Sequence, residues 1–216
     1  MMKNIIVIGA GGMGKEALWL IERINEVEPT WNILGVLDDS LLFADTTVNN
    51  YSVLGGCNDV TKYKNAYFVC AIGSSIVRKR VVEKIQQINP SIKFATLIDP
   101  SVIISDHVQI GEGTIICAQS IITVNVKIGN HSLINLDCKI SHDCILNQFA
   151  TLYPSVNLSG NTIIGDCCEI GVGSVVIQSC RVGNEAIVGA GAVVIRDIPP
   201  HCTAVGCPAK PIKFSN

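Results

Sequence analysis

The sequence is poor in aromatic and in charged residues, which make up 5% and 16% of its 216 positions. The 16 lysines and arginines are scattered among 18 acids, so the formal net charge is −2 and no basic face is available for nucleic acid or an anionic membrane. No apolar run approaches the length of a membrane span, and the run at residues 5–8 is too short for the core of a signal peptide. We therefore expect a globular cytoplasmic protein that acts on small molecules.

The sequence also lacks the spacings that mark metal sites and disulfide frameworks. Ten cysteines are present, but no C-x-x-C pair occurs, and the adjacent Cys167 and Cys168 have no second pair at zinc spacing. In a reducing compartment such cysteines are free thiols, and cysteine is among the residue types most often buried. We expect no metal site.

Aliphatic residues at every sixth position are what the sequence has in abundance. From Ile98 to Val194 every sixth residue is Ile, Leu or Val, 17 times in succession, and the residue two places before each is small or β-branched. Four of the cysteines occupy that second position (Cys138, Cys144, Cys168 and Cys180). A helix repeats every 3.6 residues and a strand every 2, so a period of six requires short strands whose alternation is reset at every corner.

Three sides of six residues close a triangular coil of 18, so this pattern predicts a parallel β-solenoid. The 17 sides make nearly six coils, and stacked strands about 4.8 Å apart give a prism on the order of 27 Å tall. Six glycines directly follow the aliphatic residue, where we expect the chain to turn a corner (Gly111, Gly129, Gly165, Gly171, Gly183 and Gly189). A sandwich or barrel of ordinary strands would need turns of variable length, which would break the phase.

The preceding residues follow a different pattern, in which strands alternate with helices. A buried-strand run at residues 4–8 leads into Gly9-Ala-Gly11-Gly-Met-Gly14 and an amphipathic helix. A second strand at residues 33–37 ends in Asp38-Asp39, and a third at residues 67–72 ends in Gly73-Ser74-Ser75 before a second helix.

A strand, G-x-G-x-x-G, a helix and then an acid form the dinucleotide-binding fingerprint, in which glycines let the backbone approach a pyrophosphate and the acid meets ribose or base. Only about 95 residues precede the solenoid, too few for both halves of a full dinucleotide domain. The sequence therefore predicts a half-domain for a mononucleotide diphosphate. The alternative is that the glycines serve only a tight turn between strand and helix.

Motifs near the end of the chain resemble those of the hexapeptide-repeat acyltransferases: "IVGAGAVV" at residues 187–194, "RDIPP" at 196–200 and "GCPAK" at 206–210. Over nearly its full length the chain resembles the bacterial sugar O-acyltransferase family, typified by sialic-acid O-acetyltransferases and by N-acetyltransferases of nucleotide-linked 4-amino-sugars. The resemblance implies an α/β Rossmann-like half-domain over residues 1–95, which holds the nucleotide. It further implies a left-handed parallel β-helix over residues 96–216, which holds acetyl-CoA as co-substrate.

The resemblance also implies roles for particular residues. The nucleotide sugar is expected to bind at Gly9, Gly11, Gly14, Asp38, Asp39 and Ser74, with Asn135 on the sugar. Acetyl-CoA is expected in a groove lined by Gly160, Val172, Ala190, Gly191 and Pro208, with Lys210 near a CoA phosphate. Two positions depart from the family, since Met13 and Thr151 stand where relatives carry His. A side-chain contact in the nucleotide site is expected to be missing at Met13, and, if the relatives' His contacts acetyl-CoA, that contact is expected to be weaker or replaced at Thr151.

The His-Asp pair in "CKISHDCILNQF", residues 138–149, stands out among packing residues. His142 comes two residues after the inward-facing Ile140, on a corner, where position alone indicates a solvated histidine. The segment "ISHDC" resembles the family's His-Glu/Asp-Cys motif, in which the His is the general base. An imidazole, with an unperturbed pKa near 6.5, suits the proton removed when an amine or hydroxyl attacks a thioester, and Asp143 would orient the ring.

A prism edge offers little enclosure, and family members are trimers with each site between neighbouring helices. We expect a homotrimer here, with Leu133, Leu136 and Ile145 as exposed interface residues. The leading hypothesis is an acetyl-CoA-dependent N-acetyltransferase of a UDP- or dTDP-linked 4-amino-4,6-dideoxy-sugar for surface polysaccharide.

Three alternatives to this hypothesis remain. O-acetylation of sialic acid or another sugar belongs to the same class of reaction. A non-catalytic scaffold would leave the "GCPAK" tail and the glycine fingerprint unexplained. A zinc hydratase would need three converging histidines, whereas His131 and His142 occupy different positions of the repeat.

Overall fold

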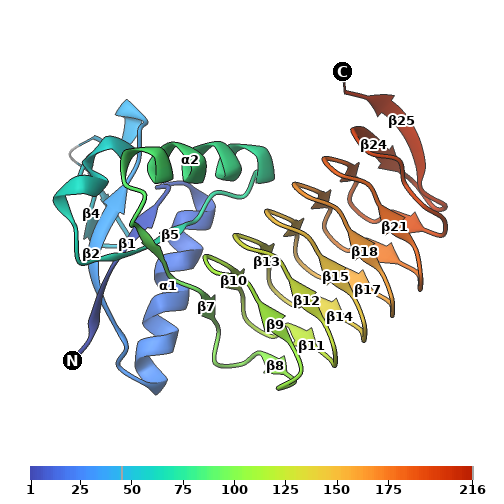
Figure 1. Cartoon of the computed structure of the whole chain (residues 1–216), viewed down its shortest axis with the longest axis horizontal. Helices are drawn as coiled ribbons and strands as arrows, with labels where there is room; N and C mark the ends of the chain where they lie inside the picture. The colour runs from blue at the N-terminus through green and yellow to red at the C-terminus, as the bar shows by residue number, and fades with distance from the viewer. Residues whose placement is uncertain (45, 216) are drawn as a thin grey trace.

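The computed structural model describes residues 1–44 and 46–215, in which a small α/β domain abuts a long solenoid (Figure 1). The domain contains one parallel sheet of order β2-β1-β5-β6. Its strands are β1 (Lys3–Ile8), β2 (Trp31–Leu37), β5 (Tyr67–Cys70) and β6 (Lys93–Phe94), and its helices are α1 (Gly12–Val27) and α2 (Ser75–Ile88). Shorter elements complete it: η1 (Leu41–Phe43), β3 (Thr47–Val48), β4 (Tyr51–Ser52) and η2 (Cys57–Lys62).

Alternation along β1 explains why one helix covers each face of this sheet. Ile5 and Val7 pack in one hydrophobic cluster with Leu18 and Ile21 of α1. Ile6 and Ile8 point to the opposite face and pack with Val82 and Ile85 of α2. Because successive side chains of a strand face opposite sides, an unbroken apolar strand requires cover on both. The predicted βαβ half-domain is confirmed.

The solenoid consists of 17 two-residue strands at six-residue intervals, as the sequence predicts. They are β7 (Leu97–Ile98), β8 (Ile103–Ile104), β9 (Gln109–Ile110), β10 (Ile115–Ile116), β11 (Ile121–Ile122), β12 (Lys127–Ile128), β13 (Leu133–Ile134), β14 (Lys139–Ile140), β15 (Ile145–Leu146), β16 (Thr151–Leu152), β17 (Asn157–Leu158), β18 (Ile163–Ile164), β19 (Glu169–Ile170), β20 (Val175–Val176), β21 (Arg181–Val182), β22 (Ile187–Val188) and β23 (Val193–Val194). A hairpin of β24 (Cys202–Val205) and β25 (Lys210–Phe214) follows.

Each strand pairs with the strand 18 residues away, so Ile116 lies beside Ile134 and Ile134 beside Leu152. Three parallel sheets result, which we call side 1 (β7, β10, β13, β16, β19 and β22), side 2 (β8, β11, β14, β17, β20 and β23) and side 3 (β9, β12, β15, β18 and β21). The edges between them are edge 1/2, edge 2/3 and edge 3/1. The aliphatic and small residues of the repeat share one continuous core.

The corners turn in a different way from the one expected. At most corners the left-handed backbone falls on the third residue after the aliphatic, with φ of 57°, 59° and 58° at Asn125, Asp143 and Phe149. The glycines that directly follow the aliphatic residue do not adopt it. A Cβ on Gly129 would lie 2.7 Å from backbone atoms of the next coil, so these glycines allow coils to stack closely. The expectation that they turn the corner through conformational freedom is wrong.

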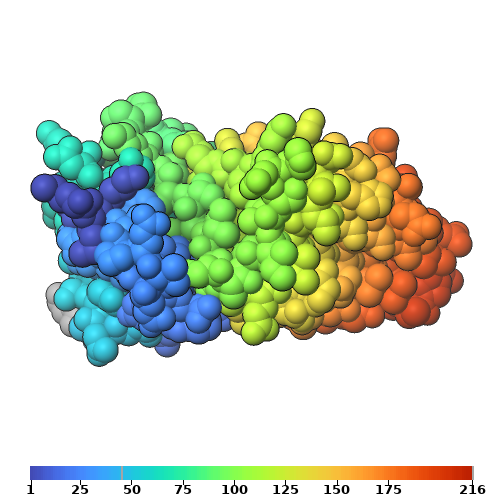
Figure 2. All heavy atoms as spheres, turned by 90° about the horizontal axis from the view of Figure 1, so that it is seen from below, coloured from blue at the N-terminus to red at the C-terminus, as the bar shows by residue number. Residues whose placement is uncertain are grey.

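The N-terminal domain packs on side 1, where its helix α1 abuts the first coils in a continuous surface (Figure 2). Ile115 and Leu133 lie in the same hydrophobic cluster as Leu18, and Leu136 packs against that cluster. Leu133 is only 1% exposed. The expectation that Leu133 is an exposed interface residue is therefore wrong, because the chain's own domain covers it.

A bidentate ion pair ties α1 to the first coil. Arg23 Nε and Nη2 donate to the two carboxylate oxygens of Asp99 at 2.6 and 3.0 Å, and Ser101 donates to the same carboxylate. Burial alone would raise the pKa of Asp99, but the hydrogen bonds from Arg23 and Ser101 leave it below its usual value.

Within the described part of the chain, neither α1 nor α2 has the length and apolarity that a membrane crossing requires.

His131 lies in the contact between the domain and edge 3/1. Its ring is 3% exposed, stacks on Phe149 at 5.1 Å and meets the edge-on ring of Phe94 at 4.7 Å. Among the described residues, its Nδ1 has no hydrogen-bond partner. Burial and, to a lesser extent, the charge of Arg78 lower the pKa of His131 to about 4.

The depressed pKa of His131 should make the protein less stable in acid. As the pH falls below about 6.5, the unfolded chain takes up a proton that the folded chain takes up only near its pKa of about 4. Stability conferred by the neutral ring is therefore lost over that interval, by about 2 kcal/mol between pH 7 and pH 5.

Denaturant unfolding of the wild type and of His131→Phe at the two pH values measures this loss. Phe149 shows that this corner of the next coil accepts a phenyl ring at φ 58°. The variant should lose about 2 kcal/mol less than the wild type. Equal losses would show that His131 does not titrate in this way.

Candidate active site

A pocket of about 380 Å³ opens at the carboxyl ends of β1, β2 and β5, the edge at which parallel α/β sheets bind ligands. Its walls come from the turn before α1, the end of β2, and the turn between β5 and α2. The residues that line the pocket include Gly9, Gly11, Met13, Asp38, Asp39 and Gly73.

The three glycines of the fingerprint have three different roles. Gly9 has φ 107° and turns the chain out of β1. A Cβ on Gly14 would collide with the Gly9 carbonyl oxygen, so Gly14 allows α1 to approach the turn. A Cβ on Gly11 would meet no atom within 4 Å, so Gly11 leaves the space in front of the α1 N-terminus open.

The two acids line the pocket and also hold its walls together. Asp38 accepts hydrogen bonds from the backbone N–H groups of Ala10 at 2.7 Å and Ser40 at 2.8 Å. Asp39 accepts from the Cys57 N–H at 2.7 Å and pairs with Lys84 at 2.9 Å. Burial alone would raise the pKa of Asp39, but the bonds from Lys84 and Cys57 lower it.

Sequence reasoning missed Lys84, because nothing in the spacing of α2 indicates that it faces an acid 45 positions earlier. It also missed Phe43 and Cys57, which line the same pocket. Burial raises the pKa of Cys57 to about 12, so this thiol stays protonated. Ser74, expected to contact the nucleotide, is the N-cap of α2 and makes no side-chain capping bond.

The His-Asp pair lies on edge 2/3, in the corner between β14 and β15. His142 Nδ1 is 2.8 Å from Asp143 Oδ2, and Asn125 of the preceding coil donates to Asp143 Oδ1 at 3.1 Å. The hydrogen bonds from His142 and then Asn125 lower the pKa of Asp143. A carboxylate that accepts from Nδ1–H fixes the tautomer in which Nε2 carries the free lone pair.

Gly160 of the next coil packs directly against this imidazole. A Cβ on Gly160 would lie 2.6 Å from His142 Nε2 and closer still to Cε1. Residues 18 positions apart stack in a column along the edge. Other residues in the column of His142 and Gly160 carry side chains, for example Val124 and Gln178. The absence of a side chain at position 160 therefore serves the ring below it, as the 18-residue spacing suggests.

The remaining predicted residues lie elsewhere on the solenoid. Val172, Ala190 and Gly191 follow strands of side 1 and lie on edge 1/2, while Pro208 and Lys210 belong to the C-terminal hairpin. The structure thus brings His142, Asp143 and Gly160 together on one edge. It puts Val172, Ala190 and Gly191 on a different edge of the same chain, and Pro208 and Lys210 on the hairpin.

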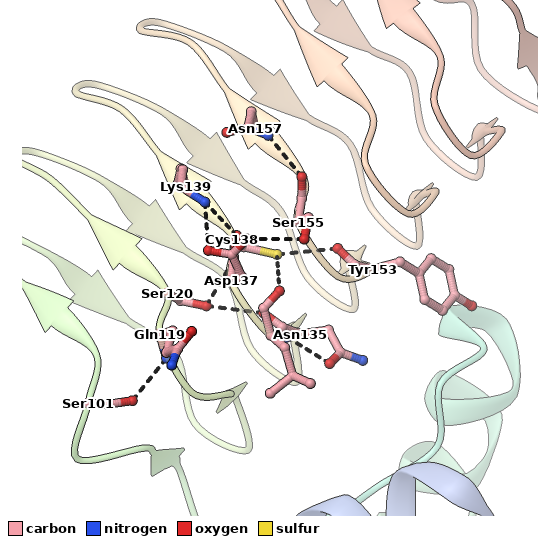
Figure 3. Close-up of polar contacts among 11 residues, drawn as sticks. Ser101, Gln119, Ser120, Asn135, Asp137, Cys138, Lys139, Tyr153, Ser155 and Asn157 are labelled. Atoms are coloured by element: carbon pink, nitrogen blue, oxygen red, sulfur yellow. Dashed lines mark hydrogen bonds and ion pairs between the residues drawn. The ribbon is translucent and has the colours of Figure 1, made fainter.

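Asn135 also lies on edge 1/2, largely buried, where its Oδ1 accepts from the Leu136 N–H at 2.7 Å. In Figure 3 its side chain and that of Tyr153 point to the side of the N-terminal helices, away from Lys139. Leu136 and the pocket residue Met13 pack against one hydrophobic cluster. Asn135 therefore lies on the edge that the pocket-bearing domain approaches.

Thr151 is fully buried beneath the N-terminal domain. Its hydroxyl accepts from Arg78 Nη2 at 2.8 Å and donates to the Gly73 carbonyl at 3.1 Å. The hydroxyl is therefore used within the chain, in the contact between the two domains. Sequence reasoning missed Arg78 altogether.

The pocket and His142 of one chain face different ways. The N-terminal domain covers side 1 and edge 3/1, through contacts with Leu133, Phe149 and Cys167. In a triangular coil, edge 2/3 is the edge opposite side 1. The pocket-bearing domain and the His142 of one chain therefore lie on different sides of the solenoid.

No group of three or more His, Cys, Asp or Glu side chains within residues 1–44 and 46–215 is arranged to hold a metal ion. All ten cysteines are free, and nine of them are buried. The site thus consists of backbone N–H groups, carboxylates and one exposed imidazole.

The chain is similar to known proteins in both sequence and fold. A family model described as the PglD N-terminal domain matches residues 4–85. A GDP-perosamine N-acetyltransferase of Escherichia coli O157:H7 is 31% identical over 216 residues, which cover 97% of this chain and 96% of that protein.

Solved structures match the whole chain as well. The acetyltransferase domain of PglB from Neisseria gonorrhoeae FA1090, in complex with acetyl coenzyme A, is 30% identical, with a TM-score of 0.88 over 98% of this chain and 100% of that one. PerB from Caulobacter crescentus, in complex with CoA and GDP-perosamine, is 28% identical, with a TM-score of 0.87 over 99% of each chain. The chain therefore belongs to the bacterial hexapeptide-repeat sugar acyltransferases, in the branch of nucleotide 4-amino-sugar N-acetyltransferases.

Proposed function

We propose that this protein transfers the acetyl group of acetyl-CoA to the amine of a nucleotide-linked 4-amino-4,6-dideoxy-sugar. The observation that carries the proposal is the exposed imidazole of His142, whose Nδ1 is held by Asp143 at 2.8 Å and whose Nε2 is free. The relatives named for GDP-perosamine add GDP to the UDP and dTDP expected from the sequence.

The reaction needs one proton to move twice. Attack of the amine on the thioester carbon forms the N–C bond, and His142 Nε2 accepts the proton that the nitrogen gives up. Asp143 stabilises the imidazolium that forms. The C–S bond then breaks, and the imidazolium returns the proton to the departing thiolate, which leaves as CoA.

The pocket would bind the nucleotide part of the acceptor. The open α1 N-terminus at Gly11 suits the diphosphate, because its backbone N–H groups and dipole favour negative charge. Asp38 and Asp39 border the same space and are positioned for the ribose or base. Asn135 would contact the sugar, and Gly160, Val172, Ala190, Gly191, Pro208 and Lys210 would border acetyl-CoA.

We further propose that the enzyme works as a homotrimer, with each site between neighbouring solenoids. The pocket and His142 of one chain face different ways, so two chains must combine to join them. Residues expected for acetyl-CoA also fall on edges 2/3 and 1/2, which neighbouring chains could bring together. A cytoplasmic location fits ten free cysteines and two nucleotide-based substrates.

Sugar O-acetylation remains the second candidate from the same chemistry. A free sialic acid would leave the fingerprint pocket without an occupant, which favours the nucleotide-linked amine. A non-catalytic scaffold would leave both the pocket and the His142–Asp143 pair without a role.

The experiment that tests the proposal is a thiol-release assay with acetyl-CoA and a panel of acceptors. The panel contains GDP-, UDP- and dTDP-linked 4-amino-sugars together with free sialic acid. We expect thiol release with one nucleotide amino-sugar and a product heavier by one acetyl group. Release with sialic acid alone would favour the O-acetyltransferase, and release with none would contradict both.

A side chain at Gly11 should block the acceptor pocket without disturbing the fold. The Cβ of Gly11→Val meets no protein atom within 4 Å, and the backbone φ of −73° suits any residue. We expect KM for the nucleotide sugar to rise at least about tenfold, since the backbone can no longer approach a phosphate. KM for acetyl-CoA and the melting temperature should stay unchanged. A rise confined to acetyl-CoA would reverse the assignment of the two sites.

A further inference from the structure

Arg78 is a buried arginine that the proposed chemistry does not use. It lies on α2, is 1% exposed, and belongs to no ion pair found among residues 1–44 and 46–215. Its five N–H donors are all engaged, but the acceptors are neutral oxygens. Burying a charge that has no opposite charge beside it costs free energy. Apolar side chains would join the two domains at a lower cost, so the presence of Arg78 here indicates a second role.

One side of the guanidinium holds the wall of the pocket. Arg78 Nη1 donates to the carbonyl oxygens of Ile72 at 2.6 Å and Gly73 at 3.0 Å. Both residues line the pocket, in the turn that leads from β5 into α2. The N–H groups thus bind the backbone that a nucleotide sugar would face.

The other side of the guanidinium holds the solenoid. Arg78 Nε donates to the His131 carbonyl at 2.9 Å, and Nη2 donates to the Phe149 carbonyl at 2.9 Å and to Thr151 Oγ1 at 2.8 Å. These acceptors belong to two successive coils. Thr151 closes the link by donating to the Gly73 carbonyl at 3.1 Å.

A third coil is tied to the same turn. Ser75 donates through its N–H and its hydroxyl to Glu169, at 2.8 and 3.0 Å, and Tyr153 donates to the other oxygen of that carboxylate at 3.0 Å. The first turn of α2 therefore rests on the solenoid through polar contacts of defined direction. Arg78 is the residue of α2 whose side chain donates to the pocket wall itself.

We propose that Arg78 is a positioning residue for the acceptor substrate: its planar fork fixes the turn at residues 72–74 against the coils and so sets where the nucleotide sugar lies. This inference rests on the proposed function. An arginine suits the task because its donors leave in fixed directions, whereas a lysine provides a single point charge. Misplacement of a substrate by about 1 Å can cost on the order of 100-fold in rate.

The test compares Arg78→Lys with the wild type by calorimetric binding of GDP-, UDP- and dTDP-linked 4-amino-4,6-dideoxy-sugars, and by steady-state kinetics with the sugar that the wild type acetylates. We expect Kd and KM for the nucleotide sugar to rise by about 10- to 100-fold. KM for acetyl-CoA should stay within about twofold, because no acetyl-CoA residue is attached to this turn. A merely structural role would lower the active fraction and leave both KM values unchanged.

Arg23→Lys is the matched control. Arg23 is the other arginine that joins the two domains, through Asp99, but it lines no pocket. This variant should lose stability and keep the KM and Kd of the nucleotide sugar. If it raises them as much as Arg78→Lys does, general contact between domains explains the effect and the proposal fails.

Thr151→Val provides a milder variant in case Arg78→Lys does not fold. It removes only the hydroxyl that joins Arg78 to Gly73, and we expect Kd for the nucleotide sugar to rise about three- to fivefold. An unchanged Kd in both variants overturns the role of Arg78 while leaving the proposed function intact. A wild type that binds none of the GDP-, UDP- and dTDP-linked 4-amino-sugars contradicts the proposed function, and the inference falls with it.

Discussion

Replacing His142 by asparagine is expected to lower kcat by a factor of about 10² to 10⁴, the usual contribution of a positioned general base. The amine must lose a proton as it attacks, and Nε2 of His142 is the group that the Nδ1–Asp143 bond leaves free for it. Asparagine keeps a polar side chain on the corner but accepts no proton. The fold should be unaffected, because the imidazole is 56% exposed.

Steady-state rates of thiol release measure this loss, together with the Kd of acetyl-CoA, which should change little. The matched control is His201→Asn. His201 is also exposed and also paired with an acid, with Nδ1 3.4 Å from Glu185, but that pair lies on edge 3/1. It should keep the wild-type rate. A near-wild-type kcat for His142→Asn would remove His142 from the base role.

The second large effect is expected from Gly160→Ala. The new Cβ would overlap the ring atoms of His142. The imidazole must therefore leave its position beside the glycine and lose its alignment with Asp143. The backbone of Gly160 is not in the left-handed region, and Val124 and Gln178 carry side chains in the same column. The variant should therefore fold normally, while kcat falls by roughly 10- to 100-fold.

A double-mutant cycle separates this cause from others. If Gly160 acts through the imidazole, adding Gly160→Ala to His142→Asn should cost little further, since the ring is already gone. Fully additive losses would mean that Gly160 acts independently of the imidazole, through its expected place beside acetyl-CoA alone. Thermal melting of each variant checks that the coil is intact.

The solenoid could be predicted from the sequence in detail because its rules are local. Each corner resets the strand, so a period of six and a coil of 18 residues follow from counting, and the pairing of Ile116 with Ile134 agrees. The role of the corner glycines could not be predicted in the same way. Their requirement arises between coils, where a Cβ on Gly129 would meet the backbone near Asn147.

The candidate site could be predicted only in part. The glycine fingerprint and the acids after β2 form one recognisable sequence motif, and Gly9, Gly11, Asp38 and Asp39 of that motif line one pocket. His142 and Gly160 were related by the 18-residue step, and Asp143 directly follows His142 in the sequence. Lys84 and Arg78 carry no such signal, because the partners of Arg78 in the solenoid lie 53 to 73 residues further along the chain.

The sequence by itself determined the coil, the column in which each residue stands and the residue that faces inward, since all three follow from periodicity. Only the tertiary structure decided which outward face is covered. Leu133 and Thr151 stand at the same repeat position as exposed residues of other sides, yet the N-terminal domain buries both. A repeat makes every side equivalent, and the equivalence is broken only where a second domain packs against one of them.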